Sequence, residues 1–448
     1  MSGSLLISIS AYAYGQVVSP IYSFNSAAVS GSPQYVVLVQ DRDASLWGTT
    51  FGSAVDFGSV FKLTTNGAER DIYSLDGTQG SEPYGGLLLG ADGNFYGTTA
   101  FGDTVNDGAL FRITRSGVYT VLHDFAGDAD GRDPLAPPIQ ASDGNLYGGT
   151  VGNVNSTIYQ YSRTGVFSTI YQFDQAHGFG VVGQLIQGAD GSLYGTATGG
   201  GVHNCGTIFK LSRAGVIFKA YSFPCGQGGS SPNSALLQAS DGNFYGTATA
   251  GGTGNVGIAF KMTPTGKVSI LHNFQDGTSD GSQPVGALTQ GTDGNLYGTT
   301  FGGGKSGAGT LFQITTAGAY SLLYSFVPTI GEGPQAGLRQ HTNGKFYGTT
   351  TLGGAFDSGA VYSLDMGLGP FITFVSATGR VGAAVQILGQ GLTGATSVTF
   401  NGVPASSVKV VTDTFLTAVV PAGATTGPVV VTTPTGTLTS NVSFIVGR

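Results

Sequence analysis

The sequence predicts an all-β protein, and three observations support this prediction. Gly accounts for 77 of the 448 residues, more than twice the usual fraction of about 7%, so the chain has many turns. Charged residues make up only 10%, against about 25% in an ordinary domain, which disfavours long helices with charged surfaces. Hydrophobic residues make up 40% and aromatic residues 11%, enough apolar surface to exclude a disordered chain.

The sequence also contains a short phrase that returns seven times. One copy is Asn94-Phe-Tyr-Gly-Thr-Thr99 and another is Ser192-Leu-Tyr-Gly-Thr-Ala197. The central aromatic residues of the copies are Trp47, Tyr96, Tyr147, Tyr194, Tyr245, Tyr297 and Tyr347. Their intervals are 49, 51, 47, 51, 52 and 50 residues. A regular period of this length indicates a repeat architecture.

Each repeat is expected to form four antiparallel strands. In residues 86–125 we expect strands at 86–90, 95–100, 109–114 and 118–125. Asp92-Gly93 supplies the tight turn after the first strand, and Arg115-Ser-Gly117 supplies the turn before the last. Such a unit exposes two edges and is not stable alone, but seven copies can close radially. The repeats therefore predict a seven-bladed β-propeller over residues 18–366.

The two ends of the repeat region predict how the ring closes. Six copies end in a last strand with the pattern Tyr/His-x-Phe/Leu, whereas the seventh stops after Ala360-Val-Tyr-Ser-Leu364. The missing phrase lies near the start of the chain, as Ile21-Tyr-Ser-Phe24. We therefore expect the N-terminal strand to complete the last blade. A linear solenoid is the competing architecture, but it does not account for this division.

The repeat phrase resembles a known family. D-G-x-L/F-Y-G-T-T, a Gly-Gly pair, G-x-h-F-K/R-h-T-x-x-G and Y-S-F are together similar to the GloVer repeat, a tandem repeat of bacterial surface and secreted proteins. The resemblance covers roughly residues 18–366, and it implies no catalytic activity.

Residues 367–448 are expected to form a second domain. After the linker-like Asp365-Met-Gly-Leu-Gly-Pro370, short apolar runs such as Val385–Leu388 and Val398–Phe400 alternate with turn residues. This spacing is typical of a β-sandwich. The order is similar to an IPT/TIG immunoglobulin-like domain. The domain contains Asp413 as its one acidic residue and neither His nor Cys.

Charge and hydropathy limit the partners. The net charge is −7 with only 18 Lys and Arg, so nucleic-acid binding is not expected. No apolar run of 18 residues occurs, so no membrane-spanning helix is expected. Residues 1–17 contain the apolar segment Leu5–Ala13, which ends in an A-x-A pattern but lacks a preceding basic region. We interpret them as a signal peptide with a clipped or misassigned start, or alternatively as a tail, and we expect a secreted or surface-exposed monomer.

Residues that occur in every repeat are expected to serve the fold. The Asp of each Asp-Gly pair fits turn geometry, and each repeated Tyr is expected to pack between blades with a partner for its hydroxyl. The Gly after each Tyr is expected to allow neighbouring sheets to approach closely.

Candidate site residues were sought on the face that carries the longer loops of the ring, because binding residues concentrate on such loops. The acidic candidates for catalysis are Glu82, Asp103, Asp107 and Glu332, with Asp276 and Asp357 on the same face. A glycoside hydrolase would need two of these carboxyl groups about 5 to 10 Å apart. The aromatic candidates for stacking on sugar rings are Phe101, Phe301 and Phe356.

Two other clusters suggest metal or acid–base chemistry. Asp128, Asp130 and Asp133 alternate as in a calcium loop, but they lack the full spacing and the closing Glu, and the alternative is a loop of the repeat's own D-G-x-x-P form. His177 and His203, with Asp174 close by, form a candidate metal or acid–base site, or are two solvated loop residues. His123 and His272 replace Tyr in the last strand of their repeats and are expected to pack.

Cys205 and Cys225, the only two cysteines, flank one end of the same predicted hairpin. We expect a disulfide between them, which would fit an oxidising compartment.

The leading hypothesis is a non-catalytic binding or adhesion platform, plausibly for a polysaccharide or cell-surface glycan, with no cofactor other than Ca²⁺. The alternatives are a glycoside hydrolase or polysaccharide lyase with acids at the channel mouth, and a purely structural module of a surface layer.

Overall fold

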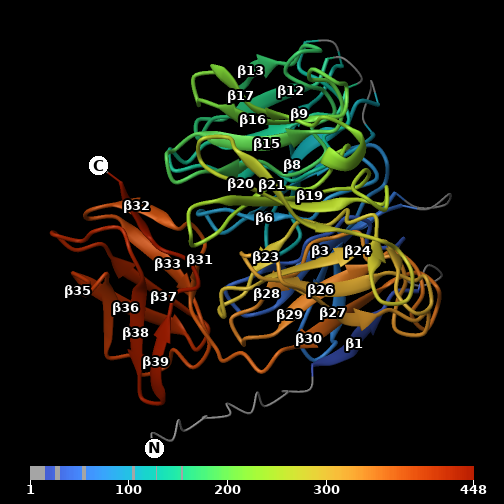
Figure 1. The fold of residues 1–448 in the computed structure, drawn as a ribbon. Coiled ribbons are helices and arrows are strands. Elements are labelled where there is room, and N and C mark those ends of the chain that lie inside the picture. Colours follow the sequence, from blue (N-terminus) through green and yellow to red (C-terminus); the bar gives the residue numbers. More distant parts are fainter. Residues whose placement is uncertain are drawn as a thin grey trace, which may run out of the picture.

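The computed structural model describes residues 16–25, 31–52, 57–102, 106–127, 129–152 and 155–447. Over these residues the chain is all-β, with one short 3₁₀ turn at Gly226–Gly228 and no α-helix (Figure 1). No helix in the described part is long and apolar enough to cross a membrane. Asp103 and Asp128, two of the candidate residues, lie outside the described ranges.

Seven four-stranded antiparallel sheets occupy Val17 to Asp365 in the described part of the chain. Each begins with a strand of two residues, and longer strands follow. The first sheet contains β2 (Val39–Gln40), β3 (Leu46–Thr50), β4 (Ser59–Leu63) and β5 (Glu69–Ser74). The second contains β6 (Leu88–Leu89), β7 (Phe95–Thr99), β8 (Ala109–Ile113) and β9 (Tyr119–Asp124). The third contains β10 (Ile139–Gln140), β11 (Leu146–Gly149), β12 (Thr157–Tyr161) and β13 (Phe167–Gln172). The next two contain β14 (Ile186–Gln187), β15 (Leu193–Ala197), β16 (Thr207–Leu211) and β17 (Ile217–Ser222); β18 (Leu237–Gln238), β19 (Phe244–Ala248), β20 (Ile258–Met262) and β21 (Val268–Asn273).

The sixth sheet contains β23 (Thr289–Gln290), β24 (Leu296–Thr300), β26 (Thr310–Ile314) and β27 (Tyr320–Ser325), beside a small pair of β22 (Gly281–Ser282) and β25 (Gly302–Gly303). The seventh contains β28 (Arg339–Gln340), β29 (Phe346–Thr350), β30 (Ala360–Asp365) and β1 (Val17–Ser23). Strand β1 pairs antiparallel with β30, so that Val17 lies opposite Asp365 and Ser23 opposite Ala360. The prediction that the N-terminal strand completes the last sheet is confirmed.

In six of the seven sheets a threonine of the repeated phrase forms a hydrogen bond to the segment that leads into the next sheet. The hydroxyl of Thr49 donates to the carbonyl of Gly85 at 2.7 Å. Equivalent bonds run from Thr98 to Ala136, Thr196 to Ser234, Thr247 to Gly286 and Thr299 to Ala336. Thr349 of the last sheet donates to the carbonyl of Val36, next to the first sheet, at 3.1 Å. These bonds therefore join six of the seven neighbouring pairs of sheets, including the last and the first; the third sheet has Gly149 at this position.

A row of glutamines forms a second set of links. The backbone amide of Ala91 donates to the Gln140 side chain at 2.8 Å, and that of Thr342 donates to Gln40 at 3.0 Å, again joining last sheet to first. Between the sheets lie apolar clusters, in which Trp47 stacks on Phe95 of the following sheet with ring centroids 4.2 Å apart. Polar links and apolar cores thus repeat together around the ring.

The repeated Asp and Tyr act as the sequence predicts. One carboxylate oxygen of Asp92 accepts the Asn94 amide at 3.1 Å, and the other accepts the Tyr96 hydroxyl at 2.8 Å. The expectation for the following Gly needs a correction. A Cβ at Gly97 would lie 2.5 Å from the ring of Phe111, its partner on the neighbouring strand of the same sheet. The Gly therefore makes room for an aromatic ring within its own sheet.

The C-terminal residues form two further four-stranded sheets and a parallel pair. One sheet contains β31 (Thr373–Phe374), β33 (Ala384–Leu388), β37 (Phe415–Val419) and β36 (Ser407–Thr412); the other contains β35 (Val403–Pro404), β34 (Ser397–Phe400), β38 (Val429–Thr433) and β39 (Gly436–Thr439); β32 (Thr378–Arg380) pairs with β40 (Ile445–Gly447). Buried side chains such as Ile387, Val398 and Val431 form one core between them.

These C-terminal sheets, coloured red in Figure 1, pack against one end of the repeat sheets. Arg42, in a turn of the first repeat sheet, lies over the ring of Phe415 at 4.8 Å, and its backbone carbonyl accepts the Thr414 hydroxyl at 2.6 Å. Gln386 donates to the carbonyl of Ala91 at 2.5 Å. The turn end of the ring is thus covered, and the end with the longer loops faces away.

Candidate functional site

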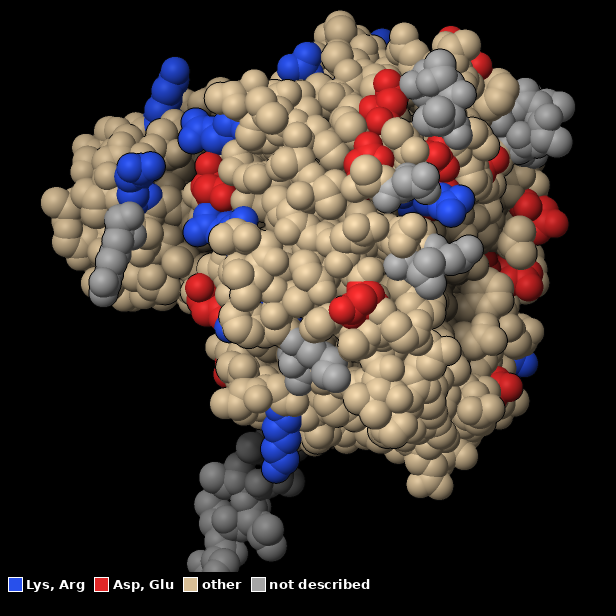
Figure 2. Space-filling model, turned by 90° about the horizontal axis from the view of Figure 1, so that it is seen from above, with Lys and Arg blue, Asp and Glu red and all other residues tan. Residues whose placement is uncertain are grey.

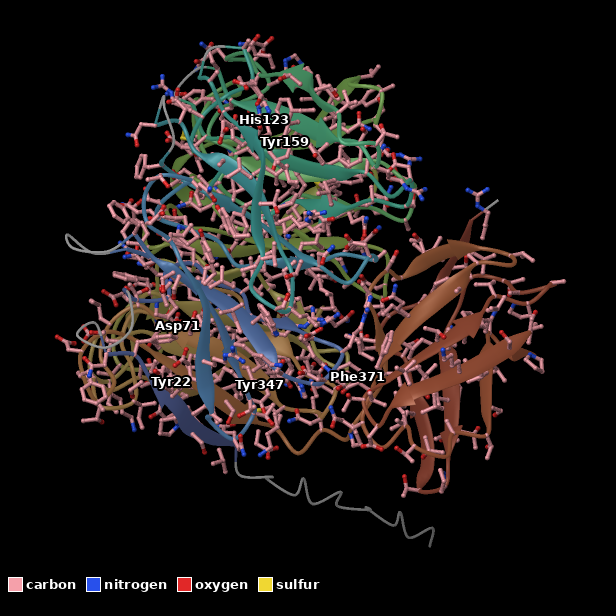
Figure 3. The ribbon with its side chains drawn as sticks, turned by 180° about the vertical axis from the view of Figure 1, so that it is seen from behind. Tyr22, Asp71, His123, Tyr159, Tyr347 and Phe371 are labelled. Carbon is pink, nitrogen blue, oxygen red and sulfur yellow. A yellow bond between two sulfur atoms is a disulfide. The ribbon has the colours of Figure 1, made fainter. Side chains whose placement is uncertain are left out.

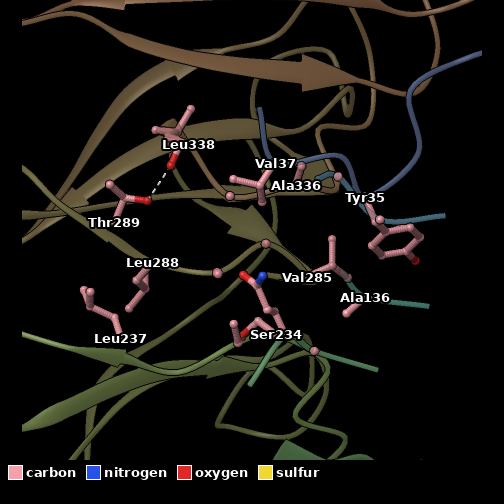
Figure 4. A pocket seen from close by; sticks show the side chains of 18 of the residues that line it. Tyr35, Val37, Ala136, Ser234, Leu237, Val285, Leu288, Thr289, Ala336 and Leu338 are labelled. Atoms are coloured by element: carbon pink, nitrogen blue, oxygen red, sulfur yellow. Dashed lines mark hydrogen bonds between the residues drawn. The ribbon is translucent and has the colours of Figure 1, made fainter. Parts of the chain in front are cut away.

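A cavity of about 350 Å³ lies where all seven repeat sheets meet (Figure 4). This volume is at the lower end of the range for small-molecule pockets. Its walls are the seven short segments that lead into β2, β6, β10, β14, β18, β23 and β28. Each segment contributes equivalent positions, so the lining is layered from the loop end to the turn end.

The layer nearest the loops contains two tyrosines and two amide side chains together with the aliphatic Leu135, Val182 and Val285. Tyr35 and Tyr84 stack with ring centroids 5.0 Å apart, and Phe51 meets Tyr84 edge-on at 5.4 Å. Asn233 and Gln335 occupy the equivalent position in other repeats. The buried Oε1 of Gln335 has no hydrogen-bond partner among the described residues. This layer therefore combines an aromatic surface with the Gln335 oxygen, a buried acceptor that has no partner among the described residues.

Small residues form the middle layer. A Cβ at Gly86 would lie 2.2 Å from the carbonyl oxygen of Val37, and one at Gly337 would lie 2.7 Å from that of Ala287. Neighbouring segments therefore approach closely because these positions lack a side chain.

Arg339 distinguishes the layer nearest the turns. Thr289, in the same layer, donates its hydroxyl to the carbonyl of Leu338 at 2.5 Å (Figure 4). Arg339 itself makes no hydrogen bond or ion pair with the described residues, and its Nε is buried. Burial lowers the pKa of the guanidinium, yet an arginine stays protonated at neutral pH. Among the described residues the cavity thus contains one cation without a partner.

The C-terminal part also reaches the cavity. Asn441 lines it, and the buried Oδ1 of Asn441 has no partner in the described part of the chain. Of the described lining residues, Arg339 alone carries a charge at neutral pH. Charged groups are also sparse and scattered on the face that Figure 2 presents. The lining is therefore suited to hold a small polar ligand, with amides, two phenol rings and one cation as its recognition groups.

None of the described acidic candidates lines this cavity. Glu82 and Glu332 are half-buried, and their backbone groups bond to neighbouring loops, as in the 2.8 Å bond from the Glu332 amide to the carbonyl of Leu352. Burial raises the pKa of the Glu82 carboxyl. The carbonyl of Asp107 accepts the Asp133 amide at 3.0 Å. Any catalytic role for these residues stays a prediction.

The predicted aromatic residues come from three different sheets. Phe101 and Phe356 are exposed, at 37% and 57%, whereas Phe301 is half-buried against Gly333. No ring contact joins the three in the described ranges. Their role in stacking on a ligand stays a prediction, and the tyrosine pair that lines the central cavity is Tyr35 and Tyr84.

The predicted metal residues have local partners. His123 pairs with Asp130 at 2.8 Å, and the Asp130 carboxylate also accepts the Ala126 amide at 3.0 Å. His272 pairs with Asp280 in the same way at 3.0 Å. His123 and His272 also stack on aromatic rings of the next sheet, as expected for packing residues. The calcium site stays a prediction, since Asp128 lies outside the described residues.

His177 and His203 do not meet. The Nδ1 of His177 lies 2.6 Å from Asp174, whereas His203 is exposed, and no contact between the two rings occurs in the described structure. Cys205 and Cys225 do form a disulfide, with Cα atoms 5.4 Å apart, so that prediction is confirmed.

The central cavity was missed, although the repeat alignment contains a signal for it. The residues that align with Arg339 in the other six repeats are Val39, Leu88, Ile139, Ile186, Leu237 and Thr289. A single charge at a position that is otherwise uncharged departs from what the fold requires. That departure is the feature that sequence reasoning could have used.

Comparisons with known proteins concern the family and the fold. The family model of the Gloeobacter/Verrucomicrobia repeat matches three overlapping stretches, residues 8–187, 88–292 and 181–410. No curated protein matches the chain. A fungal alcohol oxidase in complex with copper is 14% identical, with 93% of this chain and 98% of that chain covered and a TM-score of 0.51.

Two bacterial structures show a similar likeness. A Bacteroides fragilis protein assigned as a 6-phosphogluconolactonase is 15% identical, and the match covers 77% of this chain and 90% of that chain with a TM-score of 0.50. The extracellular domain of a B. thetaiotaomicron protein assigned as a one-component system is 11% identical. The match covers 95% of this chain and 59% of that chain, with a TM-score of 0.51. At such identities the likeness concerns the fold alone, and the chain has a β-propeller-like all-β fold.

Proposed function

Because the chain belongs to the Gloeobacter/Verrucomicrobia repeat family, we propose that its repeats form a seven-bladed β-propeller over residues 18–366. The threonine links support this architecture, since Thr349 of the last sheet bonds to Val36 as Thr49 of the first sheet bonds to Gly85. Residues 367–448 form an IPT/TIG-like immunoglobulin sandwich in this proposal. Two sheets around a common core support that assignment.

The proposed function is that of a non-catalytic binding platform for carbohydrate. The central cavity carries this proposal, because its loop-side layer combines a stacked tyrosine pair with an unpartnered amide oxygen. Aromatic surfaces with a few placed polar groups are the usual composition of small-molecule sites. The two carboxyl groups that glycoside hydrolysis uses are contributed by none of the lining residues described.

The proposed location is outside the cytoplasm. The disulfide between Cys205 and Cys225 supports it, because structural disulfides persist mainly in oxidising compartments.

A glycan array combined with a reducing-sugar release assay on the same polysaccharides tests the function. We expect retention without release. Tyr84→Ala should weaken retention at least tenfold, whereas Tyr73→Ala, which truncates a similar tyrosine stack on the outer strands, should not. Release of reducing sugar would instead support the hydrolase, and the absence of both would support a structural module. Retention that is equal in both variants would exclude the central cavity as the site.

A further inference from the structure

We propose that the central cavity selects carbohydrates that carry a carboxylate, such as hexuronic acids, and that Arg339 is the residue that recognises it. This inference rests on the proposed carbohydrate-binding function and names the substrate class of that site.

Arg339 is costly to the fold. A buried charge without a partner is unfavourable; the side chain of Arg339 is half-buried, and its Nε is buried without a partner among the described residues. The equivalent residue is uncharged in the other six repeats, for example Leu237 and Thr289. The ring therefore folds without a cation at this position, and a ligand anion would supply the partner that the described protein groups do not.

The guanidinium of Arg339 is chemically suited to bind a carboxylate. Its planar fork matches a carboxylate in a two-bond geometry. The attraction is stronger inside a cavity than in water, because the effective dielectric constant is lower there. A protein with a net charge of −7 does not attract anions at long range, so discrimination at this site has to come from a local contact.

The other lining residues are suited to bind the hydroxyl groups and the ring of a sugar. Gln335 and Asn441 line the same cavity as Arg339, and their buried side-chain oxygens have no hydrogen-bond partner among the described residues. Sugar hydroxyls are donors that fit these acceptors, while Tyr35 and Tyr84 offer a surface for the sugar ring. One monoanionic group among several hydroxyls is the composition of a uronic acid.

Calorimetric titration of the full chain with sodium glucuronate, glucose and glucose 6-phosphate tests the inference. We expect glucuronate to bind at least tenfold more tightly than glucose and also more tightly than the phosphate. Arg339→Thr, which copies the residue of the sixth repeat, should remove this preference. Lys305→Gln removes one positive charge from an exposed loop and should leave both affinities unchanged.

The outcomes separate the two proposals. Equal binding of glucuronate and glucose, or a preference that survives in Arg339→Thr, would overturn the acid selectivity alone. A preference for the phosphate would overturn it as well. If none of the three sugars, nor any glycan of the array, binds the native chain, the proposed function fails too. Thermal unfolding of Arg339→Thr checks that it folds, and we expect a Tm at or above the native value because an unpaired buried charge is removed.

Discussion

The phenolic hydroxyl of Tyr22 donates a hydrogen bond of 3.1 Å to the carboxylate of Glu69. Tyr22 lies on β1, at the start of the chain, and Glu69 begins β5 of the first repeat sheet, near Asp71 (Figure 3). At the next junction the equivalent residues are Tyr73 and Tyr119, which stack with centroids 4.6 Å apart. The junction at which the ring closes is therefore bridged by a hydrogen bond in place of an aromatic stack.

Tyr22→Phe should weaken this junction. Loss of one partly exposed hydrogen bond lowers the free energy of unfolding by about 1 kcal/mol, which urea denaturation measures. Tyr324→Phe is the matched control, because Tyr324 occupies the same position in the sixth repeat and its hydroxyl has no hydrogen-bond partner in the described part of the chain. Equal losses in the two variants would show that the bond to Glu69 does not contribute.

The same junction predicts a dependence of stability on pH. Burial raises the pKa of Glu69, and the nearby Asp71 raises it further. Burial also raises the pKa of Asp71. A folded carboxyl with a raised pKa favours the folded state below its unfolded pKa of about 4, and this contribution is lost as the pH rises through the folded pKa.

Glu69→Gln removes one of these titrations and keeps an acceptor for Tyr22. We expect its Tm to exceed that of the native chain at pH 7 and to equal it at pH 3. Thermal unfolding followed by circular dichroism at both pH values provides the measurement. A Tm at pH 7 below the native value would mean that the charged hydrogen bond outweighs the cost of burial.

The strand bounds predicted from the sequence agree with the structure, except for the first strand of the repeat. Expected strands at 95–100, 109–114 and 118–125 correspond to β7, β8 and β9 within a residue or two at each end, because turn residues bound them. The expected strand at 86–90 is reduced to Leu88–Leu89. The carbonyl of Gly85, just before it, accepts Thr49 of the preceding sheet, so a link between sheets replaces the ladder there.

The cavity could not be read from the sequence in the same way. Its lining comes from segments about 50 residues apart, and each contributes mostly small or apolar residues that resemble an ordinary core. Tyr35 and Tyr84 meet because they lead into neighbouring sheets, and closure of the ring places Arg339 on the same cavity. Acidic residues in loops have a recognisable chemical role in a sequence, whereas small and apolar lining residues do not. The sequence therefore indicated the loop residues as candidates and not the cavity.

Removal of the disulfide should destabilise the chain without changing its fold. Cys205 and Cys225 are 20 residues apart in sequence, and a cross-link over a loop of this size contributes about 3 kcal/mol. The double variant Cys205→Ser/Cys225→Ser should therefore unfold at a lower urea concentration. The native chain with reductant should match the double variant, and a reductant that lowers stability in both would point to another cause.

His341 predicts a loss of stability in acid. The ring is 1% exposed, its Nε2 donates to the carbonyl of Ala44 at 3.0 Å, and its Nδ1 accepts the Asn343 amide at 3.1 Å. Burial lowers the pKa of His341 to about 4 although the Ala44 carbonyl opposes the shift. A second proton would have to enter at Nδ1, where the Asn343 amide already points, so the folded ring stays neutral.

The sign follows from comparison with the unfolded chain, in which the pKa of the ring is about 6.5. Stability is fully present above that value and is lost as the pH falls toward the folded pKa, by about 2 kcal/mol between pH 7 and pH 5. His341→Ala copies Ala141 and Ala239, the residues at this position in the third and fifth repeats. Urea denaturation at the two pH values should show a smaller acid-induced loss in this variant. His203→Ala, at an exposed histidine, should keep the native pH response, and an unchanged response in His341→Ala would assign the acid sensitivity to other groups.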